Sequence, residues 1–211
     1  AEAAIVVDGV LNEAVWTSAR WPLYESRFAG LAARQGAQET HVQMAWDEDF
    51  LYVAGALADA DIVSTLEGRD ARLWTEDVLE VFVFSTERSS YLEVQGSPDG
   101  DLFDAAFTAH RQGGPAWNGG AKTAASVQYA AGDSRQELGW QVEFALPWRD
   151  VCAHTDAPCS PAPNQTLKVN VFRIDKGPGG RALGSALAPT WSPDFHAADA
   201  AARAVHTRPQ S

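Results

Sequence analysis

RLWTEDVLEVFVF, residues 72–84, decides how the rest of the chain is interpreted. An indole at Trp74 and two carboxylates precede an apolar run, in which a strand would place Val78, Glu80 and Phe82 on one face. A lone carboxylate in so apolar a run must reach solvent or have a partner, because burying an unpaired charge costs several kcal/mol or forces protonation. The stretch therefore predicts a strand that carries both core residues and binding-site residues.

Composition and charge narrow the classes of partner. The chain has 211 residues, of which 45% are hydrophobic, and a formal net charge of −12. A chain of this length buries roughly 70% of its unfolded surface, so we expect one domain over residues 1–211. The negative charge disfavours nucleic acid and anionic lipid, and no apolar run is long enough to insert into a membrane. Neutral ligands and cations remain open as partners.

The cysteines bear on the compartment. Cys152 and Cys159 lie in VCAHTDAPC, a proline-bearing loop without the spacing of metal ligands. A local disulfide is the first interpretation and two free thiols are the alternative. Oxidation favours an exported protein, secreted or periplasmic. The chain begins AEAAIVV without a charged and then apolar leader, so we expect that any signal peptide has been removed.

Short alternating runs separated by turns dominate the chain, and little of it has a helical period. They predict an all-β fold, an antiparallel β-sandwich of the immunoglobulin or jelly-roll type with one short N-terminal helical turn. The expected strands are residues 5–7, 42–46, 51–58, 78–84, the hairpin around 98–100, 123–129, 138–146, 166–174 and 204–206. Residues 175–189 are expected to form a loop.

Five motifs occur in order along nearly the whole chain: VDGVLNEAVW, AWDEDFLYVAGALAD, LWTEDVLEVFVF, GWQVEFALPW and WSPDFH. Together they resemble the family-nine carbohydrate-binding modules and their relatives. The resemblance implies a β-sandwich that binds a mono- or oligosaccharide or a polysaccharide chain end, with structural calcium. It also allows a catalytic domain outside this chain, and haem-binding relatives share the sandwich, so the fold alone does not fix the ligand.

The resemblance also assigns site residues. Trp74 and Trp191 match two sugar-stacking tryptophans, Glu80 matches a carboxylate that bonds sugar hydroxyls, and Gln95 stands where sugar-binding members have an amide. A pyranose has an apolar face that stacks on an indole and hydroxyls that carboxylates and amides bond. The alternative is that both tryptophans are core residues. Trp117, in a glycine-rich loop, is a candidate third contact.

One position departs from the family pattern. Glu93 stands where sugar-binding members carry an arginine, two positions before the amide. An acceptor-only group thus replaces a donor-only group. Arg173 is the candidate to supply the missing donors, and a solvated strand arginine is the alternative.

Loop aspartates support the calcium that the resemblance implies, because calcium binds six to eight oxygens from carboxylates and carbonyls. Acidic turns that only solubilise the protein are the alternative. The candidates are Asp8, Asp47, Asp49, Asp59 and Asp61.

Enzymatic and redox functions receive little support. No HExxH, GxSxG, P-loop or Cys/His nucleophile pattern occurs, so we expect a non-catalytic protein. The rival class is a haem-binding electron-transfer domain with Met44 as an axial ligand and a residue such as His196 opposite. Met44 alternates with apolar neighbours, which favours core packing, and no CxxCH is present.

Overall fold

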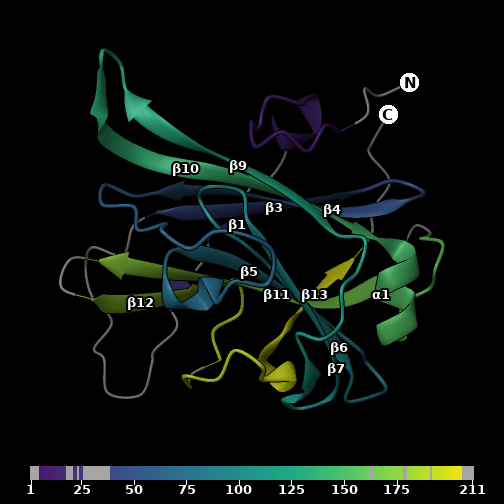
Figure 1. The fold of residues 1–211 in the computed structure, drawn as a ribbon. Coiled ribbons are helices and arrows are strands. Elements are labelled where there is room, and N and C mark those ends of the chain that lie inside the picture. The colour runs from purple at the N-terminus through teal and green to yellow at the C-terminus, as the bar shows by residue number, and fades with distance from the viewer. Residues whose placement is uncertain are drawn as a thin grey trace.

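A computed structural model describes residues 5–17, 21–22, 24–25, 39–161, 164–177, 180–190 and 192–205. Two antiparallel sheets pack face to face as a β-sandwich (Figure 1). The smaller sheet has the strand order β1-β3-β4-β10-β9, and the larger has the order β2-β12-β11-β5-β6-β7-β8 with β13 paired to β11. The strands are β1 Trp21–Pro22, β2 Tyr24–Glu25, β3 Thr40–Trp46, β4 Phe50–Ala58, β5 Val78–Phe84, β6 Tyr91–Gly96, β7 Leu102–Ala109, β8 Gln112–Gly114, β9 Lys122–Ala130, β10 Asp133–Pro147, β11 Thr166–Gly177, β12 Arg181–Ala186 and β13 Ala202–Val205; the helical elements are η1 Ala14–Thr17, η2 Leu73–Thr75, α1 Trp148–His154 and η3 Ala198–Ala200.

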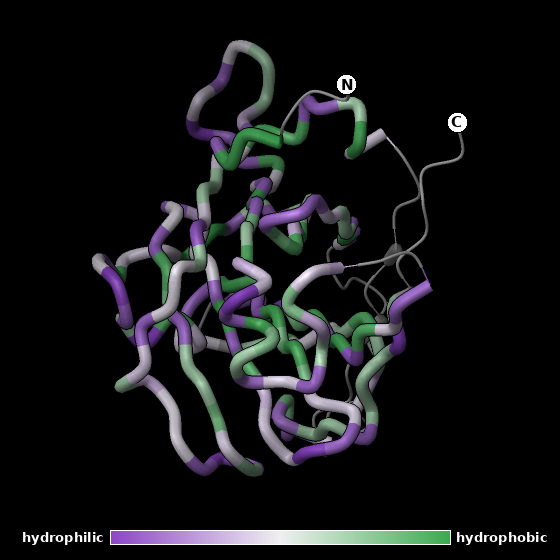
Figure 2. Tube along the Cα trace, turned by 90° about the vertical axis from the view of Figure 1, so that its right-hand side faces the viewer, coloured by the Kyte–Doolittle hydropathy of each residue, from purple (hydrophilic) through white to green (hydrophobic). Residues whose placement is uncertain are grey.

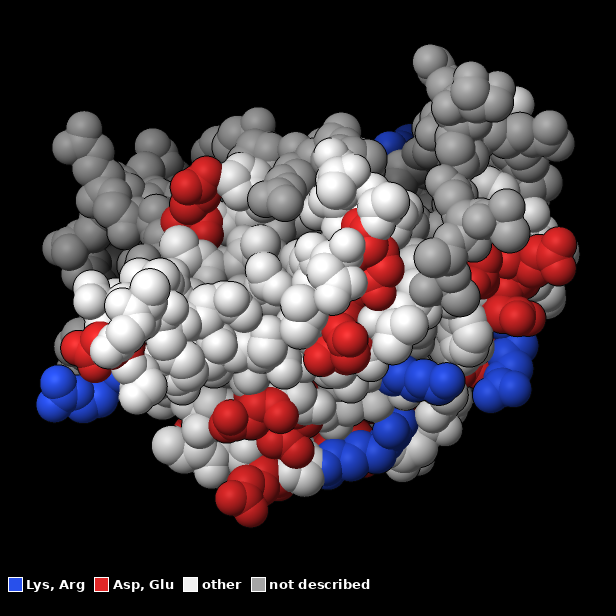
Figure 3. Space-filling model, turned by 90° about the horizontal axis from the view of Figure 1, so that it is seen from above, with Lys and Arg blue, Asp and Glu red and all other residues white. Residues whose placement is uncertain are grey.

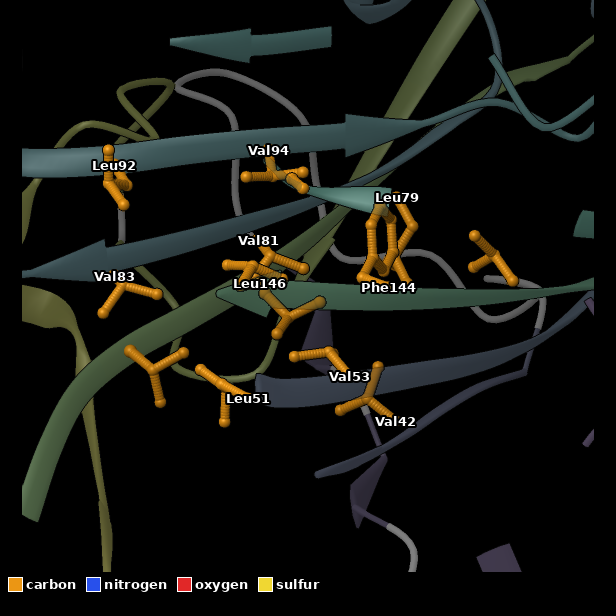
Figure 4. Close-up of a cluster of buried hydrophobic side chains, with 14 of the residues drawn as sticks. Val42, Leu51, Val53, Leu79, Val81, Val83, Leu92, Val94, Phe144 and Leu146 are labelled. Carbon is orange, nitrogen blue, oxygen red and sulfur yellow. The ribbon is translucent and has the colours of Figure 1, made fainter. Parts of the chain in front are cut away.

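The main core lies between the sheets. Val81 of β5 packs with Val53 of β4 and Phe144 of β10, which all point into the space between the two layers (Figure 4). Fully burying such a side chain stabilises the fold by about 1.5–3 kcal/mol. The most hydrophobic stretches accordingly run through the interior and the polar ones through the turns (Figure 2).

A second apolar layer covers the outer face of the larger sheet. Phe82 and Phe172 point outward from β5 and β11 and are fully buried. The segment 192–201 lies across this face, and its Phe195 stacks on Phe172 with ring centroids 4.1 Å apart. Leu73 of η2 joins the same cluster. The strand β5 is therefore buried on both sides, which explains its continuous apolar run.

The N-terminal segment covers part of the outer face of the smaller sheet. Trp16 is 1% exposed and packs on Tyr52. Its indole Nε1 donates a 2.9 Å hydrogen bond to Glu143 of β10, and the backbone N–H groups of Asp8 and Gly9 donate to the same carboxylate. The view from this side shows several separate groups of acidic side chains (Figure 3), as the net charge of −12 leads one to expect.

The sequence predictions for the fold are largely confirmed. The β-sandwich, the hairpin strands and the N-terminal helical turn are present, and Cys152 and Cys159 form a disulfide with Cα atoms 5.0 Å apart. Among the described residues, no helix is long and apolar enough to cross a membrane.

Three predictions for individual elements are wrong. Residues 5–7 form no strand, and instead Ile5 and Val7 pack against the cluster around Trp16 while Val6 is exposed. Cys152 was expected in a loop but lies in helix α1, which begins directly after β10. The buried residues Trp148 and Val151 hold one face of this helix against the core. Strand β12 occupies part of the expected loop, because its backbone pairs with β11 although its sequence, RALGSA, has low strand propensity.

Candidate functional site

Strand register brings the predicted acceptors together on the outer face of the larger sheet. Phe172, Glu80, Gln95 and Phe103 are paired in one row across β11, β5, β6 and β7. Glu93 lies in the next row, two residues from Gln95 on the same strand and the same face. The predicted alternation of β5 is thus confirmed, and the face carries two carboxylates and one amide among aromatic rings.

These polar groups are deeply placed. Glu80, Glu93 and Gln95 are 3%, 5% and 1% exposed. The Gln95 Nε2 donates a 2.5 Å hydrogen bond to Glu93 Oε1, while the Gln95 Oε1 is buried with no hydrogen-bond donor. The group therefore offers acceptors that a donor-rich ligand would satisfy.

Burial sets the protonation of the two carboxyls. Burial, and then repulsion from Glu93, raises the pKa of Glu80 well above its ordinary value. Burial also raises the pKa of Glu93 to about 7, although the Gln95 amide and the Arg111 charge oppose the shift. Near neutral pH the pair holds at least part of a proton, because two buried like charges so close are unfavourable.

Trp74 supplies an aromatic surface at the edge of this group. It lies in η2 and is 36% exposed. Its ring makes a T-shaped contact with Phe103, at 5.2 Å between centroids and 72° between planes. The Arg72 guanidinium lies 5.6 Å from the indole centroid. Because Phe103 is in the same row as Gln95, the half-exposed indole stands beside the acceptors.

The sequence did not reveal a polar clasp that holds residues 192–196 on this face. Arg111 donates a 2.9 Å hydrogen bond to Asp194, and the His110 Nε2 lies 3.2 Å from the same carboxylate. Tyr91 and the His196 Nδ1 share a 2.7 Å hydrogen bond. Burial lowers the pKa of His196 to about 4, and the Arg111 charge adds to the effect. The clasp joins segments more than 80 residues apart, so no local pattern could have indicated it.

Arg173 does not belong to this group, contrary to the prediction. It is 1% exposed and points into the sandwich, on the face of β11 opposite Phe172. Its Nη1 donates 2.9 Å hydrogen bonds to Thr40 Oγ1 and to the carbonyl of Ala58. Its Nη2 donates a 2.8 Å hydrogen bond to Asp59. It is therefore neither a donor at Glu93 nor a solvated arginine.

The other predicted aromatic contacts are not brought to Trp74. Trp191 lies outside the described residues. Trp117 packs on the main core and on His154 of α1, at 4.9 Å between ring centroids. The structure thus places Trp117 with the helix and not with the acceptor group.

The two candidate haem ligands lie apart in the fold. Met44 packs against the core between the sheets. His196 lies on the outer face of the larger sheet, in contact with Phe82 and Phe107. Nothing in this arrangement favours haem binding.

Buried carboxylates at one end of the sandwich fit a calcium ion. Oxygens of Asp59, Asp77 and Asp175 lie within 4.8 Å of one another, and all three residues are buried. Burial raises the pKa of Asp77 to about 6 and also raises the pKa of Asp175. Arg173 pairs with Asp59 and Asp175 at 2.8 and 3.4 Å, which leaves three carboxylates facing one cation. The hard oxygen donors and the excess negative charge suit calcium.

The five predicted calcium ligands divide between this cluster and other roles. Asp59 is a member of the cluster. Burial, and then repulsion from Asp59, raise the pKa of Asp61. Asp8 accepts a hydrogen bond from the Val10 N–H. Asp47 accepts three, from the N–H groups of Asp49 and Phe50 and from the Tyr52 hydroxyl, and Asp49 is exposed in the same turn. Sequence analysis missed Asp77 and Asp175, which come into range only through the pairing of β5 with β11.

Comparisons with solved structures show the same fold in sugar-related proteins. A proposed carbohydrate-binding protein from Bacteroides uniformis superposes with a TM-score of 0.70 at 16% identity, over 88% of this chain and 84% of that one. A family 9 carbohydrate-binding module from Caldicellulosiruptor kristjanssonii superposes in complex with glucose (TM-score 0.65, 12% identity, 99% and 95% covered). Its complex with cellotriose superposes with a TM-score of 0.61 at 12% identity, over 88% and 80% of the two chains.

Sequence comparisons agree with the fold. No curated protein sequence matches the chain. The sequence profile of the carbohydrate family 9 binding domain-like family matches residues 7–184, which is most of the chain. The chain therefore belongs to the carbohydrate family 9 binding domain-like family.

Proposed function

We propose that this domain binds a sugar on the outer face of the larger sheet, with the ring stacked on Trp74. Trp191 is the proposed second stacking residue, and Glu80, Glu93 and Gln95 accept hydrogen bonds from the sugar. The observation that carries the proposal is the group of buried acceptors beside a half-exposed indole. Family 9 modules are non-catalytic, and structural neighbours bind glucose and cellotriose, which supports this assignment.

The chemistry of the face matches a pyranose. An indole offers a flat apolar surface to the C–H face of the ring, and Trp74 packs edge-on against Phe103. Sugar hydroxyls are donors, so they satisfy the acceptor that Gln95 leaves without a partner. The apolar side chains around the acceptors exclude water, which strengthens each hydrogen bond between a sugar hydroxyl and an acceptor.

We further propose that the domain works outside the cytoplasm. The disulfide between Cys152 and Cys159 is suited to an oxidising compartment, and polysaccharides are encountered there. Calcium is the proposed structural ion, held by Asp59, Asp77 and Asp175. An ion there would join the residue after β4 of one sheet to the residue before β5 and to β11 of the other.

Calorimetric titration of the protein with mono- and oligosaccharides tests the sugar-binding proposal. Trp74→Ala should weaken binding roughly tenfold or more through the loss of apolar contact, and the melting temperature should stay within a few degrees. Tyr129→Ala is the matched control, because Tyr129 is an aromatic residue 47% exposed on the other sheet.

Two results would overturn the proposal. One is a wild-type protein that binds nothing in a broad panel of sugars. The other is a Trp74→Ala protein that folds and binds as tightly as the wild type, which would leave the indole without a role in recognition.

A further inference from the structure

The ligand face is rich in acceptors and poor in donors. Glu80 and Glu93 present carboxyl oxygens, and the Gln95 Oε1, in a residue that is 1% exposed, is buried and has no donor. The Gln95 Nε2 is already used by Glu93. A neutral hydroxyl offers a single proton, so it can satisfy one of these acceptors and neutralises no charge.

The basic groups nearest to the pair are engaged elsewhere. Arg173 is buried on the opposite face of β11 with Asp59. Arg111 acts on the Glu93 charge but forms its ion pair with Asp194, at 2.9 Å. Burial and repulsion from Glu93 raise the pKa of Glu80, and the Arg72 guanidinium lies over the Trp74 ring. On the described part of this face, the carboxyl groups of the pair therefore outnumber the cation that acts on them.

We propose that this face selects a sugar residue that bears a protonated amine, so that the ligand's ammonium group lies between Glu80 and Glu93. The inference rests on the proposed sugar-binding function and names the class of sugar, a hexosamine with a free amine.

Three physical features favour such a ligand. An ammonium has three donors and no acceptor, which complements two carboxylates and the free Gln95 oxygen. Charge-assisted hydrogen bonds are roughly twice as strong as neutral ones. The net charge of −12 also concentrates small cations near the protein. The ring of the amino sugar stacks on Trp74 as a neutral pyranose would.

Calorimetric titration with glucosamine, glucose and N-acetylglucosamine tests the proposal. The three rings differ in one substituent, and only the first carries a charge. At pH 7 we expect glucosamine to bind roughly tenfold or more tighter than glucose, and N-acetylglucosamine to gain nothing over glucose. Monomers are used because a polycationic chain would adhere to any acidic surface.

A matched pair of variants locates the effect. Glu93→Gln keeps the shape of the side chain and should remove the preference for glucosamine over glucose. Glu87→Gln makes the same change in net charge at an exposed residue of the β5–β6 turn and should keep the preference. An equal loss in both variants would assign the preference to overall charge and overturn the proposal.

The pH profile gives a second readout. Burial raises the pKa of Glu93 to about 7, so a proton competes with the ligand's ammonium group for the carboxyl pair. Glucosamine affinity should therefore rise from pH 5 to pH 7. Tyr91, His110, Arg111, Asp194 and His196 also face this region, and burial lowers the pKa of His196 to about 4, below this pH interval. Glucose affinity should change less.

The outcomes separate the two proposals. Binding of glucose or cello-oligosaccharides with no preference for glucosamine would overturn the amino-sugar inference and leave sugar binding intact. Failure to bind any of the three sugars or their oligomers would overturn both.

Discussion

Glu80 and Glu93 lie on one face of adjacent strands, and burial raises the pKa of both carboxyls, that of Glu93 to about 7. An unfolded glutamate titrates near pH 4.3, so above that pH the native state holds the proton more tightly than the unfolded state. The unfolding free energy should therefore fall as pH rises from about 4.5 to 7, by about 1–3 kcal/mol from this pair. Urea unfolding at pH 5.0 and pH 7.5 measures the change.

Glu93→Gln isolates that contribution from the other titrating groups. The variant has one buried carboxyl instead of two, so its stability should fall less over the same pH interval. Asp77, whose pKa burial raises to about 6, acts in the same direction in both proteins and cancels in the comparison. Parallel pH profiles for the two proteins would contradict the prediction.

For single residues, the sequence indicated which side chain is out of place in an apolar strand better than it indicated where a side chain points. Glu80 in VLEVFVF marked a site because a carboxylate is out of place in a strand core, and the structure puts it among acceptors. Arg173 could not be placed, because β11 is apolar on both faces: Val171 points into the sandwich and Phe172 points out. Periodicity gives no orientation for such a strand. The residue that fixes it, Asp59, is 114 positions away.

The N-terminal segment is attached to the smaller sheet through one carboxylate, Glu143, which accepts three N–H groups. Glu143→Ala leaves those donors without an acceptor, two of them buried, and should cost about 2–4 kcal/mol of stability. Limited proteolysis should then cut the segment 5–17 faster than in the wild type. Glu48→Ala, at an exposed turn residue, is the control and should behave as the wild type. Equal cleavage rates in the two variants would show that side-chain packing of Trp16 suffices.

The disulfide joins Cys152 of α1 to Cys159 in the connection from α1 to β11 and closes a short loop. The chain-entropy relation gives about 2–3 kcal/mol for a separation of 7 residues. Reduction should therefore lower the unfolding free energy by at most that amount in urea unfolding, with the native fold retained. The Asp156 carboxylate also binds the backbone and hydroxyl of Thr86, so the loop keeps a second attachment. Two alkylated thiols in the unreduced protein, detected by mass spectrometry, would contradict the bond.

Elements with a strong period or turn signal were predictable, and those defined by their partners were not. The β3–β4 and β6–β7 hairpins have apolar alternation and acidic or Pro-Asp-Gly turns. Strand β12 has neither, and it exists because β11 offers free backbone groups. Helix α1 has only seven residues, too few for a helical period to show in the sequence.

At the scale of the molecule, the two sheets meet at the acidic cluster of Asp59, Asp77 and Asp175, within a chain of net charge −12. A calcium ion bound there only in the folded state would stabilise the protein, by about 2.7 kcal/mol at a concentration one hundred times its Kd. For a chain of this size, that corresponds to a rise of roughly 5–10 °C in melting temperature over the chelated protein. Differential scanning calorimetry with EDTA, calcium and magnesium measures the shift.

Two variants and the pH decide whether this cluster is the calcium site. Asp77→Asn should abolish most of the calcium-dependent rise, while Asp99→Asn, at an exposed residue of the β6–β7 turn, should preserve it. Calcium also competes with a proton at Asp77, whose pKa burial raises to about 6, so the rise should shrink as pH falls below 6. A melting temperature that is the same with calcium and with EDTA would contradict a structural calcium ion. A full response in Asp77→Asn would move it to another set of carboxylates and leave the buried pair of Arg173 and Asp59 to join the sheets without it.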